Sequence, residues 1–234
     1  MTSAIILAGG FGTRLRSAVP DLPKPMAPIG SRPFLEHQLD YWIQQGVSHF
    51  VLSVGYRHEA IVGHFGNSYN GANLEYVIED SPLGTGGGLL LAAEKVSKSE
   101  SFLLLNGDTY FAVNLDVLIE FSLTNDADWC FSLFRPHEEG RYMGMEISQQ
   151  GRITSLKSGT GRSGRLSNGG VYLVNPRALI HKKFMLGDKL SLEDEIFPMA
   201  MAWGQRLMGM EFPGIFIDIG VPEDYHRAPN LLST

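Results

Sequence analysis

A short apolar run that ends in a cluster of glycines is the feature that most constrains the fold of this chain. Residues Ala4–Ala8 have the character of a buried strand, and Gly9, Gly10 and Gly12 follow within four positions. Glycine permits a tight turn and lets peptide N–H groups approach a ligand without interference from a Cβ atom. We therefore expect a strand end at which a small ligand lies directly against the backbone.

Positive charge follows these glycines. Arg14, Arg16 and Lys24 lie within eleven residues, and Asp21 is the one acid among them. Backbone N–H donors beside fixed cations suit a polyphosphate. No P-loop string is present, and Leu15 stands where a dinucleotide fingerprint needs its third glycine. The sequence therefore predicts a phosphate site of another kind, with a glycine turn beside a solvated basic face as the alternative.

Strand-like and helix-like segments alternate through the first half of the chain. This alternation predicts a Rossmann-like α/β fold, in which a mostly parallel central sheet carries helices on both faces. Ligands bind such sheets outside the carboxyl ends of the strands, so the glycine turn, Glu79 and Asp108 are expected to meet at one edge. The expected strands are Ala4–Ala8, Phe50–Val54, Leu74–Glu79 and Phe102–Asn106, and the expected helices are Phe34–Gln45, Arg57–Phe65, Gly88–Val96 and, capped by Asn114, Leu115–Ser122.

The second half reads as short strands joined by hairpins, which predicts a smaller antiparallel subdomain. Ser191 opens a capping-box pattern for a helix to about Ala202, and Ser158–Ser167 is a glycine- and serine-rich loop. The expected strands are Asp128–Phe134, Met143–Ser148, Ile153–Lys157, Gly170–Val174, Arg206–Glu211 and Ile215–Ile219.

Composition excludes several classes of function. The net charge of −6 argues against nucleic acid or an anionic membrane as a partner. The single cysteine, Cys130, lies in an apolar run typical of core and cannot form an intramolecular disulfide, which indicates a reducing compartment. The start of the chain lacks the pattern of a signal peptide, and no segment approaches the ~20 apolar residues that span a bilayer. We expect a cytoplasmic protein, either monomer or homodimer.

The glycine turn and the lysine after it resemble a known signature. Gly9–Leu15 reads Gly-Gly-Phe-Gly-Thr-Arg-Leu and is followed by Pro23-Lys24-Pro25, which is similar to the sugar-1-phosphate nucleotidyltransferases. The resemblance extends to about Tyr225. It implies that a sugar 1-phosphate attacks the α-phosphorus of a nucleoside triphosphate and that pyrophosphate leaves. From 234 residues, 44% of them hydrophobic, we expect one domain, 1–234, with two compact domains as the alternative. The resemblance implies a nucleotide-binding half at 1–125 and a sugar-phosphate-binding half at 126–234.

The same resemblance assigns roles on the nucleotide side. Arg14, Lys24 and Asp108 are expected to be catalytic. Asp218 lies inside an apolar run, where a carboxylate is costly to bury unless it is paired or holds a metal. Mg²⁺ prefers one or two carboxylates, and the resemblance places it on Asp108 and Asp218. The residues expected to contact the nucleotide are Leu7, Ala8, Gly9, Gly10, Gly12, Thr13, Arg14, Glu79, Gly84, Thr85 and Asp108.

Glu79 indicates which base is bound. Relatives that use uridine or thymidine nucleotides tend to have a glutamine here. A carboxylate only accepts hydrogen bonds, whereas uracil and thymine offer one N–H beside a carbonyl. Guanine offers two N–H groups side by side, so Glu79 favours GTP; a solvated acid at a strand end is the alternative.

The sugar side departs from the family pattern. Asn168-Gly169 resembles the start of the family's Asn-Ala-Gly-Ile-Tyr, whose asparagine contacts sugar hydroxyls. The usual Glu-Lys-Pro is missing, so Lys157, Arg162 or Arg165 is expected to bind the sugar phosphate. Glu193 and Asp194 are interpreted as acids at a helix start. The expected sugar-phosphate contacts are Gly86, Lys157, Asn168 and Gly169.

Four phrases, among them Pro-Lys-Pro-Met-Ala-Pro and Pro-Leu-Gly-Thr-Gly-Gly, look most similar to the short guanylyltransferases of D-glycero-D-manno-heptose 1-phosphate. This implies GTP, a heptose 1-phosphate and Mg²⁺. Mannose 1-phosphate with GTP, or another sugar 1-phosphate with UTP, is the alternative substrate pair. A non-catalytic sensor of nucleotide sugars is the alternative from a different class.

Overall fold

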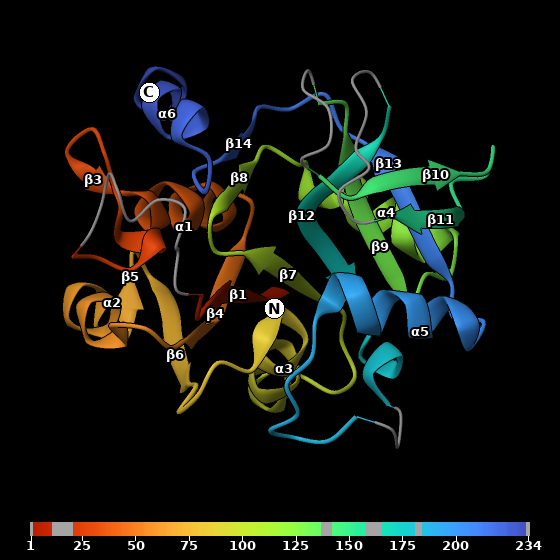
Figure 1. Cartoon of the computed structure of the whole chain (residues 1–234), viewed down its shortest axis with the longest axis horizontal. Helices are drawn as coiled ribbons and strands as arrows, with labels where there is room; N and C mark the ends of the chain where they lie inside the picture. The colour runs from red at the N-terminus through yellow and green to blue at the C-terminus, as the bar shows by residue number, and fades with distance from the viewer. Residues whose placement is uncertain (1, 11–20, 137–141, 158–164, 181–183, 233–234) are drawn as a thin grey trace.

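The computed structural model describes residues 2–10, 21–136, 142–157, 165–180 and 184–232. A ten-stranded sheet runs through both halves of the chain (Figure 1), in the order β11-β10-β12-β7-β1-β4-β6-β5, with β9 beside β12 and β13 beside β9. Its strands are β1 (Thr2–Ala8), β4 (Val47–Val54), β5 (Ser68–Tyr69), β6 (Ala72–Ile78), β7 (Phe102–Asn106), β9 (Trp129–Phe134), β10 (Gly144–Ile147), β11 (Ile153–Lys157), β12 (Ser167–Val174) and β13 (Leu207–Glu211).

The first half forms the parallel part of this sheet, as the sequence predicted. Strand β1 lies between β4 and β7 and is parallel to both, and β4 is parallel to β6 on its other side. Parallel strands place their carboxyl ends at one edge. The residues that follow β1, β6 and β7 therefore share that edge.

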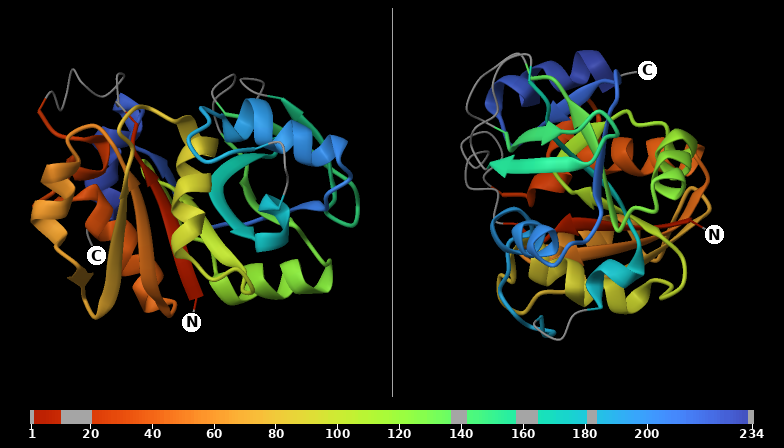
Figure 2. Two further views of the ribbon diagram at one scale, coloured as in Figure 1. Left: turned by 90° about the horizontal axis from the view of Figure 1, so that it is seen from below. Right: turned by 90° about the vertical axis from the view of Figure 1, so that its right-hand side faces the viewer.

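Alternate residues of these strands face two separate cores. Ile6 and Leu52 pack on one side, with α1 (Phe34–Gln44), α2 (His58–Phe65) and α4 (Leu115–Thr124). Ile5 and Val51 face the other side, with α3 (Gly84–Ala92) and α5 (Phe197–Ala202). Helices thus cover both faces (Figure 2). Strands buried on both faces read as continuous apolar runs, which is why their positions were predictable.

The second half continues the sheet mostly with antiparallel strands, although β13 is parallel to β9. Strand β12 is antiparallel to β7, β9 and β10, and β10 forms an antiparallel pair with β11. This confirms the smaller antiparallel region expected for the second half. Cys130 lies buried on β9, and burial raises the pKa of its thiol to about 12, which agrees with its interpretation as a core residue.

Two expected helices differ from the structure. The glycine-rich segment is itself helical, so α3 begins at Gly84 rather than Gly88. A Cβ at Gly87 would lie 2.3 Å from the carbonyl oxygen of Asp188, so glycine allows this close approach. The helix after Ser191 is divided: Leu192–Ile196 forms a wide π-type turn before α5. Ser191 caps it as predicted, through the backbone N–H of Asp194.

The C-terminal segment returns to the first half of the molecule (Figure 1). Strand β14 (Phe216–Asp218) forms a small antiparallel ribbon with β8 (Thr109–Phe111). Helix α6 (Pro222–Leu232) packs against β14 and against the hairpin of β2 (Pro28–Ile29) and β3 (Arg32–Pro33). Strand β8 and helix α6 were not predicted. Among the described residues, no helix combines the length and apolar character needed to cross a membrane.

Candidate active site

A cavity of about 300 Å³ opens at the carboxyl edge of the parallel strands. The loops after β1, β6 and β7 form it, so these strand ends meet as expected. Nine of the predicted catalytic and nucleotide-binding residues line it. The lining residues are Leu7, Ala8, Gly9, Gly10, Lys24, Pro25, Glu79, Pro82, Gly84, Thr85, Asn106, Gly107 and Asp108.

Gly107 brings Asp108 against the first strand. Its backbone N–H donates to the carbonyl oxygen of Leu7 at 2.9 Å. A Cβ at Gly107 would lie 2.5 Å from that same oxygen, closer than any side chain can approach. The Asn-Gly-Asp turn therefore does more than reverse the chain, because it places the Asp108 carboxylate beside the turn that follows β1.

Lys24 provides the cation at this edge. It begins a single 3₁₀ turn, Lys24–Met26, which follows an extended proline and contains a second one. The Nζ atom of Lys24 lies 2.6 Å from Oδ2 of Asp108, and the side chain of Lys24 is 17% exposed. Fixed backbone dihedrals on both sides hold the base of this long side chain, which gives the ammonium group a defined position.

Asp218 joins Asp108 through the β14–β8 ribbon. Asp218 pairs with Thr109 in register, and the N–H of Ile219 donates to the backbone carbonyl of Asp108 at 3.0 Å. Burial, and then the negative charge of Asp108, raise the pKa of Asp218 to about 6. A Cβ at Gly220 would lie 2.5 Å from Nζ of Lys24 and 2.8 Å from Oδ1 of Asp218, so both groups lie against this glycine.

The donor set formed by these residues fits Mg²⁺. The negative charge of Asp108 raises the pKa of Asp218, and a cation bound by both carboxylates relieves that repulsion. In the described part of the chain, no three His, Cys, Asp or Glu side chains group closely enough to hold a metal by themselves. Mg²⁺ commonly takes only one or two protein carboxylates and completes its shell with water and phosphate oxygens. The pair Asp108 and Asp218 therefore matches the chemistry of a metal that binds together with a phosphate substrate.

Glu79 occupies the junction of two cavities. Its Oε1 accepts a hydrogen bond from Ser53 Oγ at 2.8 Å, and its Oε2 accepts one from the N–H of Leu83 at 3.0 Å. A Cβ at Gly9 would lie 2.3 Å from Oε1, so the carboxylate lies directly under the glycine turn. A second cavity of about 360 Å³ shares these walls and is lined by Gly9, Gly55, Tyr56, His58, Ile78, Glu79, Asp80, Ser81 and Pro82.

The residues predicted to bind the sugar phosphate lie on neighbouring strands. Asn168 and Gly169 lie on β12, and Asn168 Nδ2 donates to the hydroxyl of Tyr172 at 2.7 Å. Lys157 ends β11, and Gly144 pairs with both Lys157 and Ser167. Lys157 is thus two strands from Ser167, about 10 Å at the usual strand spacing, on one level of the sheet. None of these residues lines the 300 Å³ cavity.

Several of the predicted site residues lie either outside the described residues or away from the cavity. Gly12, Thr13, Arg14 and Arg162 lie outside the described residues, as does most of the predicted loop at 158–167. Arg165 is exposed, 4.0 Å from Glu146. Gly86 is buried, where a Cβ would meet Ile196 and Leu190, and its N–H donates to the Leu190 carbonyl. It packs the helix and lies away from the cavity walls.

Sequence reasoning missed a role for Glu193. Its side chain accepts a hydrogen bond from Thr85 Oγ1 at 3.1 Å, and Thr85 Oγ1 in turn accepts from the N–H of Leu192 at 2.8 Å. Burial raises the pKa of Glu193. Burial also raises the pKa of Tyr172, the partner of Asn168, and the negative charge of Glu193 adds to that increase. Glu193 therefore interacts with Thr85, a predicted nucleotide contact, and with Tyr172, the partner of the predicted sugar contact Asn168. Its position at a helix start gave no signal of this.

Comparison with known proteins identifies the family of the chain. The model of the nucleotidyl transferase family matches residues 3–234. The D-glycero-alpha-D-manno-heptose 1-phosphate guanylyltransferase of Aneurinibacillus thermoaerophilus is 40% identical over 96% of each chain. The mannose-1-phosphate guanylyltransferase of Mycobacterium tuberculosis is 31% identical over 96% of this chain and 62% of its own. The crystal structure of HddC from Yersinia pseudotuberculosis complexed with GMP-PN superposes with a TM-score of 0.86 at 33% identity, covering 98% of this chain and 99% of that one. The match to this family model over residues 3–234 and the 40% identity over nearly the whole chain show that the protein belongs to the nucleotidyl transferase family.

Proposed function

We propose that this nucleotidyltransferase joins GTP to D-glycero-α-D-manno-heptose 1-phosphate, giving a GDP-heptose and pyrophosphate. The choice of GTP rests on the position of Glu79 at the junction of the two cavities. Two donors hold its carboxylate, and each oxygen keeps a further lone pair that can accept from guanine N1–H and N2–H. The choice of heptose rests on the relatives in Aneurinibacillus thermoaerophilus and Campylobacter jejuni, which are 40% and 38% identical.

The base of the nucleotide is assigned to one cavity and its phosphates to the other. The 360 Å³ cavity has Tyr56 and His58 among its walls, which suit the flat face of a purine. The 300 Å³ cavity contains Lys24 and Asp108, which suit the phosphates and their counterion. Glu79 and the glycine turn belong to both, so a nucleotide that spans the junction has its base and its phosphates in chemically matched surroundings.

Catalysis then depends mainly on position and charge. The attacking oxygen of a sugar 1-phosphate is already an anion at neutral pH, so no general base is needed. The barrier comes from bringing two anions together and from charge on the phosphoryl oxygens. Lys24 supplies a fixed positive charge at the α-phosphate, and Arg14 is assigned to the departing pyrophosphate. Asp108 and Asp218 would hold Mg²⁺, which supplies charge neutralisation and a common template for both substrates.

The test measures pyrophosphate release for each of the four nucleoside triphosphates with heptose, mannose and glucose 1-phosphate. We expect the highest kcat/KM with GTP and the heptose, no turnover in EDTA, and recovery on addition of Mg²⁺. Asp108→Asn serves as the inactive control. Higher kcat/KM with mannose 1-phosphate would favour the activity named for the Mycobacterium relative. Higher turnover with UTP than with GTP would refute the role of Glu79.

A further inference from the structure

The backbone of Asp218 is held by a second, buried carboxylate. Asp224 lies in the first turn of α6 and is 6% exposed. Its Oδ2 accepts a hydrogen bond from the N–H of Asp218 at 3.1 Å. The Asp218 N–H thus donates to a side chain six positions along the chain.

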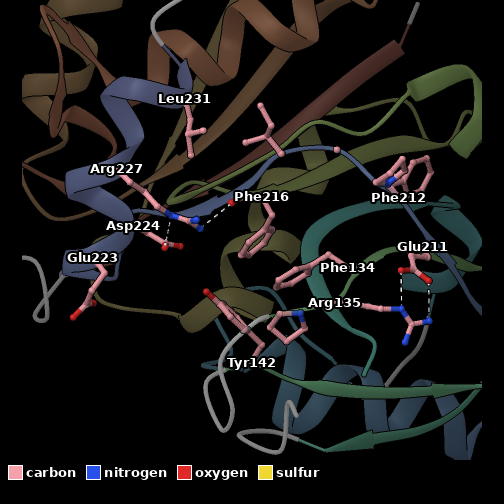
Figure 3. Close-up of a pocket in the computed structure, with 14 residues that line it drawn as sticks. Phe134, Arg135, Tyr142, Glu211, Phe212, Phe216, Glu223, Asp224, Arg227 and Leu231 are labelled. Carbon is pink, nitrogen blue, oxygen red and sulfur yellow. Dashed lines mark hydrogen bonds and ion pairs between the residues drawn. The ribbon is translucent and has the colours of Figure 1, made fainter. Parts of the chain in front are cut away.

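Arg227 holds Asp224 in turn. Its Nε donates to Oδ1 of Asp224 at 2.9 Å, and its Nη2 approaches the backbone carbonyl of Phe216 at 3.5 Å. Figure 3 shows this guanidinium between α6 and β14, on the wall of a cavity of about 540 Å³ that is separate from the site described above. One side chain therefore connects the helix to the strand on which Asp218 lies.

The segment after Asp218 completes the arrangement. The N–H of Gly220 donates to Oδ1 of Asp218 at 2.8 Å, and the N–H of Val221 donates to its carbonyl oxygen at 3.1 Å. The side chain, the carbonyl and the N–H of Asp218 each have a defined partner. Of these three, only the partner of the N–H is a side chain, so it alone depends on the identity of the residue at its position.

We propose that Asp224 is a positioning residue for the metal-binding carboxylate of Asp218. The proposal rests on the proposed function, in which Asp108 and Asp218 hold Mg²⁺. Groups that hydrogen-bond the ligands of a metal fix their orientation, and their loss typically weakens metal binding by about 10- to 100-fold. Asp224 acts here through the backbone: it fixes the end of β14 and so the direction in which the Asp218 carboxylate points.

A helix-start acid is the competing interpretation, because acids stabilise the first turn of a helix. Glu223 offers the matched comparison, since it lies in the same turn but is exposed. If helix stabilisation is all that Asp224 provides, Asp224→Ala and Glu223→Ala should have similar effects. If Asp224 positions Asp218, only the first substitution should alter metal binding.

The experiment measures binding of Mn²⁺ to the purified chain by electron paramagnetic resonance at saturating GTP and without the sugar 1-phosphate, because phosphate oxygens complete the shell of such a metal and no turnover occurs without the second substrate. We expect the Kd for Mn²⁺ to rise about 10- to 100-fold in Asp224→Ala and to stay within twofold in Glu223→Ala. Asp224→Asn keeps an acceptor oxygen for the Asp218 N–H, so it should recover most of the affinity. Arg227→Gln leaves that hydrogen bond in place and should raise the Kd by less than Asp224→Ala.

Steady-state kinetics provide a second measurement. In Asp224→Ala, the Mg²⁺ concentration for half-maximal rate should rise by the same factor while the KM for GTP at saturating Mg²⁺ stays within twofold. Circular dichroism shows whether each variant is folded. If Asp224→Ala is not folded, the Kd for Mn²⁺ of Asp224→Asn is compared with that of the native protein instead. A folded Asp224→Ala with native Mn²⁺ affinity would overturn the proposal. Native protein that shows GTP-dependent turnover but binds no Mn²⁺ would overturn the metal assignment and this proposal with it, and leave the choice of GTP standing.

Discussion

Replacing Glu79 by glutamine tests how the protein selects its base. The structure predicts how the new side chain settles. The N–H of Leu83 can only donate, so the amide oxygen must face it, as Oε2 of the carboxylate does now at 3.0 Å. The amide NH₂ then faces Ser53 Oγ, whose hydroxyl can accept as well as donate. Glu79→Gln therefore keeps an acceptor for the Leu83 N–H and removes only the acceptor of the Ser53 hydroxyl proton, a cost of about 1–3 kcal/mol that the fold should survive.

The magnitude follows from the hydrogen bonds that change. Guanine needs two acceptors, and the amide replaces one of them by a donor. A hydrogen bond to a charged group contributes about 1.5–3 kcal/mol. At 1.36 kcal/mol for each factor of ten, its loss lowers kcat/KM for GTP by about 10- to 150-fold. Uracil pairs an N–H with a carbonyl, which an amide matches, so kcat/KM for UTP should stay the same or rise.

The assay is pyrophosphate release with GTP and with UTP at one fixed sugar 1-phosphate, and the quantity reported is the ratio of the two kcat/KM values. Glu75→Gln is the control, because Glu75 lies on β6, the strand that Glu79 follows, but pairs with His49 away from the site. If the ratio of kcat/KM for GTP to kcat/KM for UTP in Glu79→Gln stays within twofold of the native value, Glu79 only stabilises the loop between β6 and α3.

Three further substitutions test other parts of the site. Lys24→Met should lower turnover by about 10²–10³-fold in the same assay, the usual cost of removing one preorganised group at a developing charge; loss of less than fivefold would remove Lys24 from the mechanism. Asp218→Asn should raise the stability of the metal-free protein at pH 7.5, because burial and Asp108 raise the pKa of Asp218 to about 6 from an ordinary value of 3.8. The native state therefore loses stability as pH rises from about 4 to 6, by at most about 3 kcal/mol, and the difference in Tm between variant and native protein should vanish at pH 4. Gly107→Ala should cost about 1–3 kcal/mol in unfolding free energy and lower turnover, because its Cβ would lie 2.5 Å from the carbonyl oxygen of Leu7; Gly63→Ala, where a Cβ meets nothing within 4 Å, should leave Tm unchanged or raise it slightly.

The parallel half of the fold was predictable because its signals are local. The strand predicted at Phe102–Asn106 has those bounds in the structure, and Asn114 caps α4 through the N–H of Val117. The π-type turn after Ser191 and the early start of α3 were not predictable. Both depend on packing between Gly84–Gly87 and the segment from Asp188 to Leu190, which lies far along the chain.

The candidate site was likewise predictable only in part. Three parts of the site could be recognised from the sequence: the turn after β1, Lys24 and the Asn-Gly-Asp turn. In each of them, turn-forming residues lie within a few positions of a charged group. Glu193 and Asp224 are not, since an acid at a helix start is ordinary and only its burial and partners distinguish it.

The sequence by itself determined the parallel sheet, the glycine turn at its edge and the anionic ligand that such a turn favours. Those features depend on the order of apolar and turn-forming residues along a short stretch of chain. Only the tertiary structure decided which contacts bring Asp218 beside Asp108, that Asp224 holds it there, and that Glu79 faces both cavities. Each depends on the register of β14 against β8 or on how loops from separate strands pack, and a register is a relation between distant segments that neither segment specifies alone.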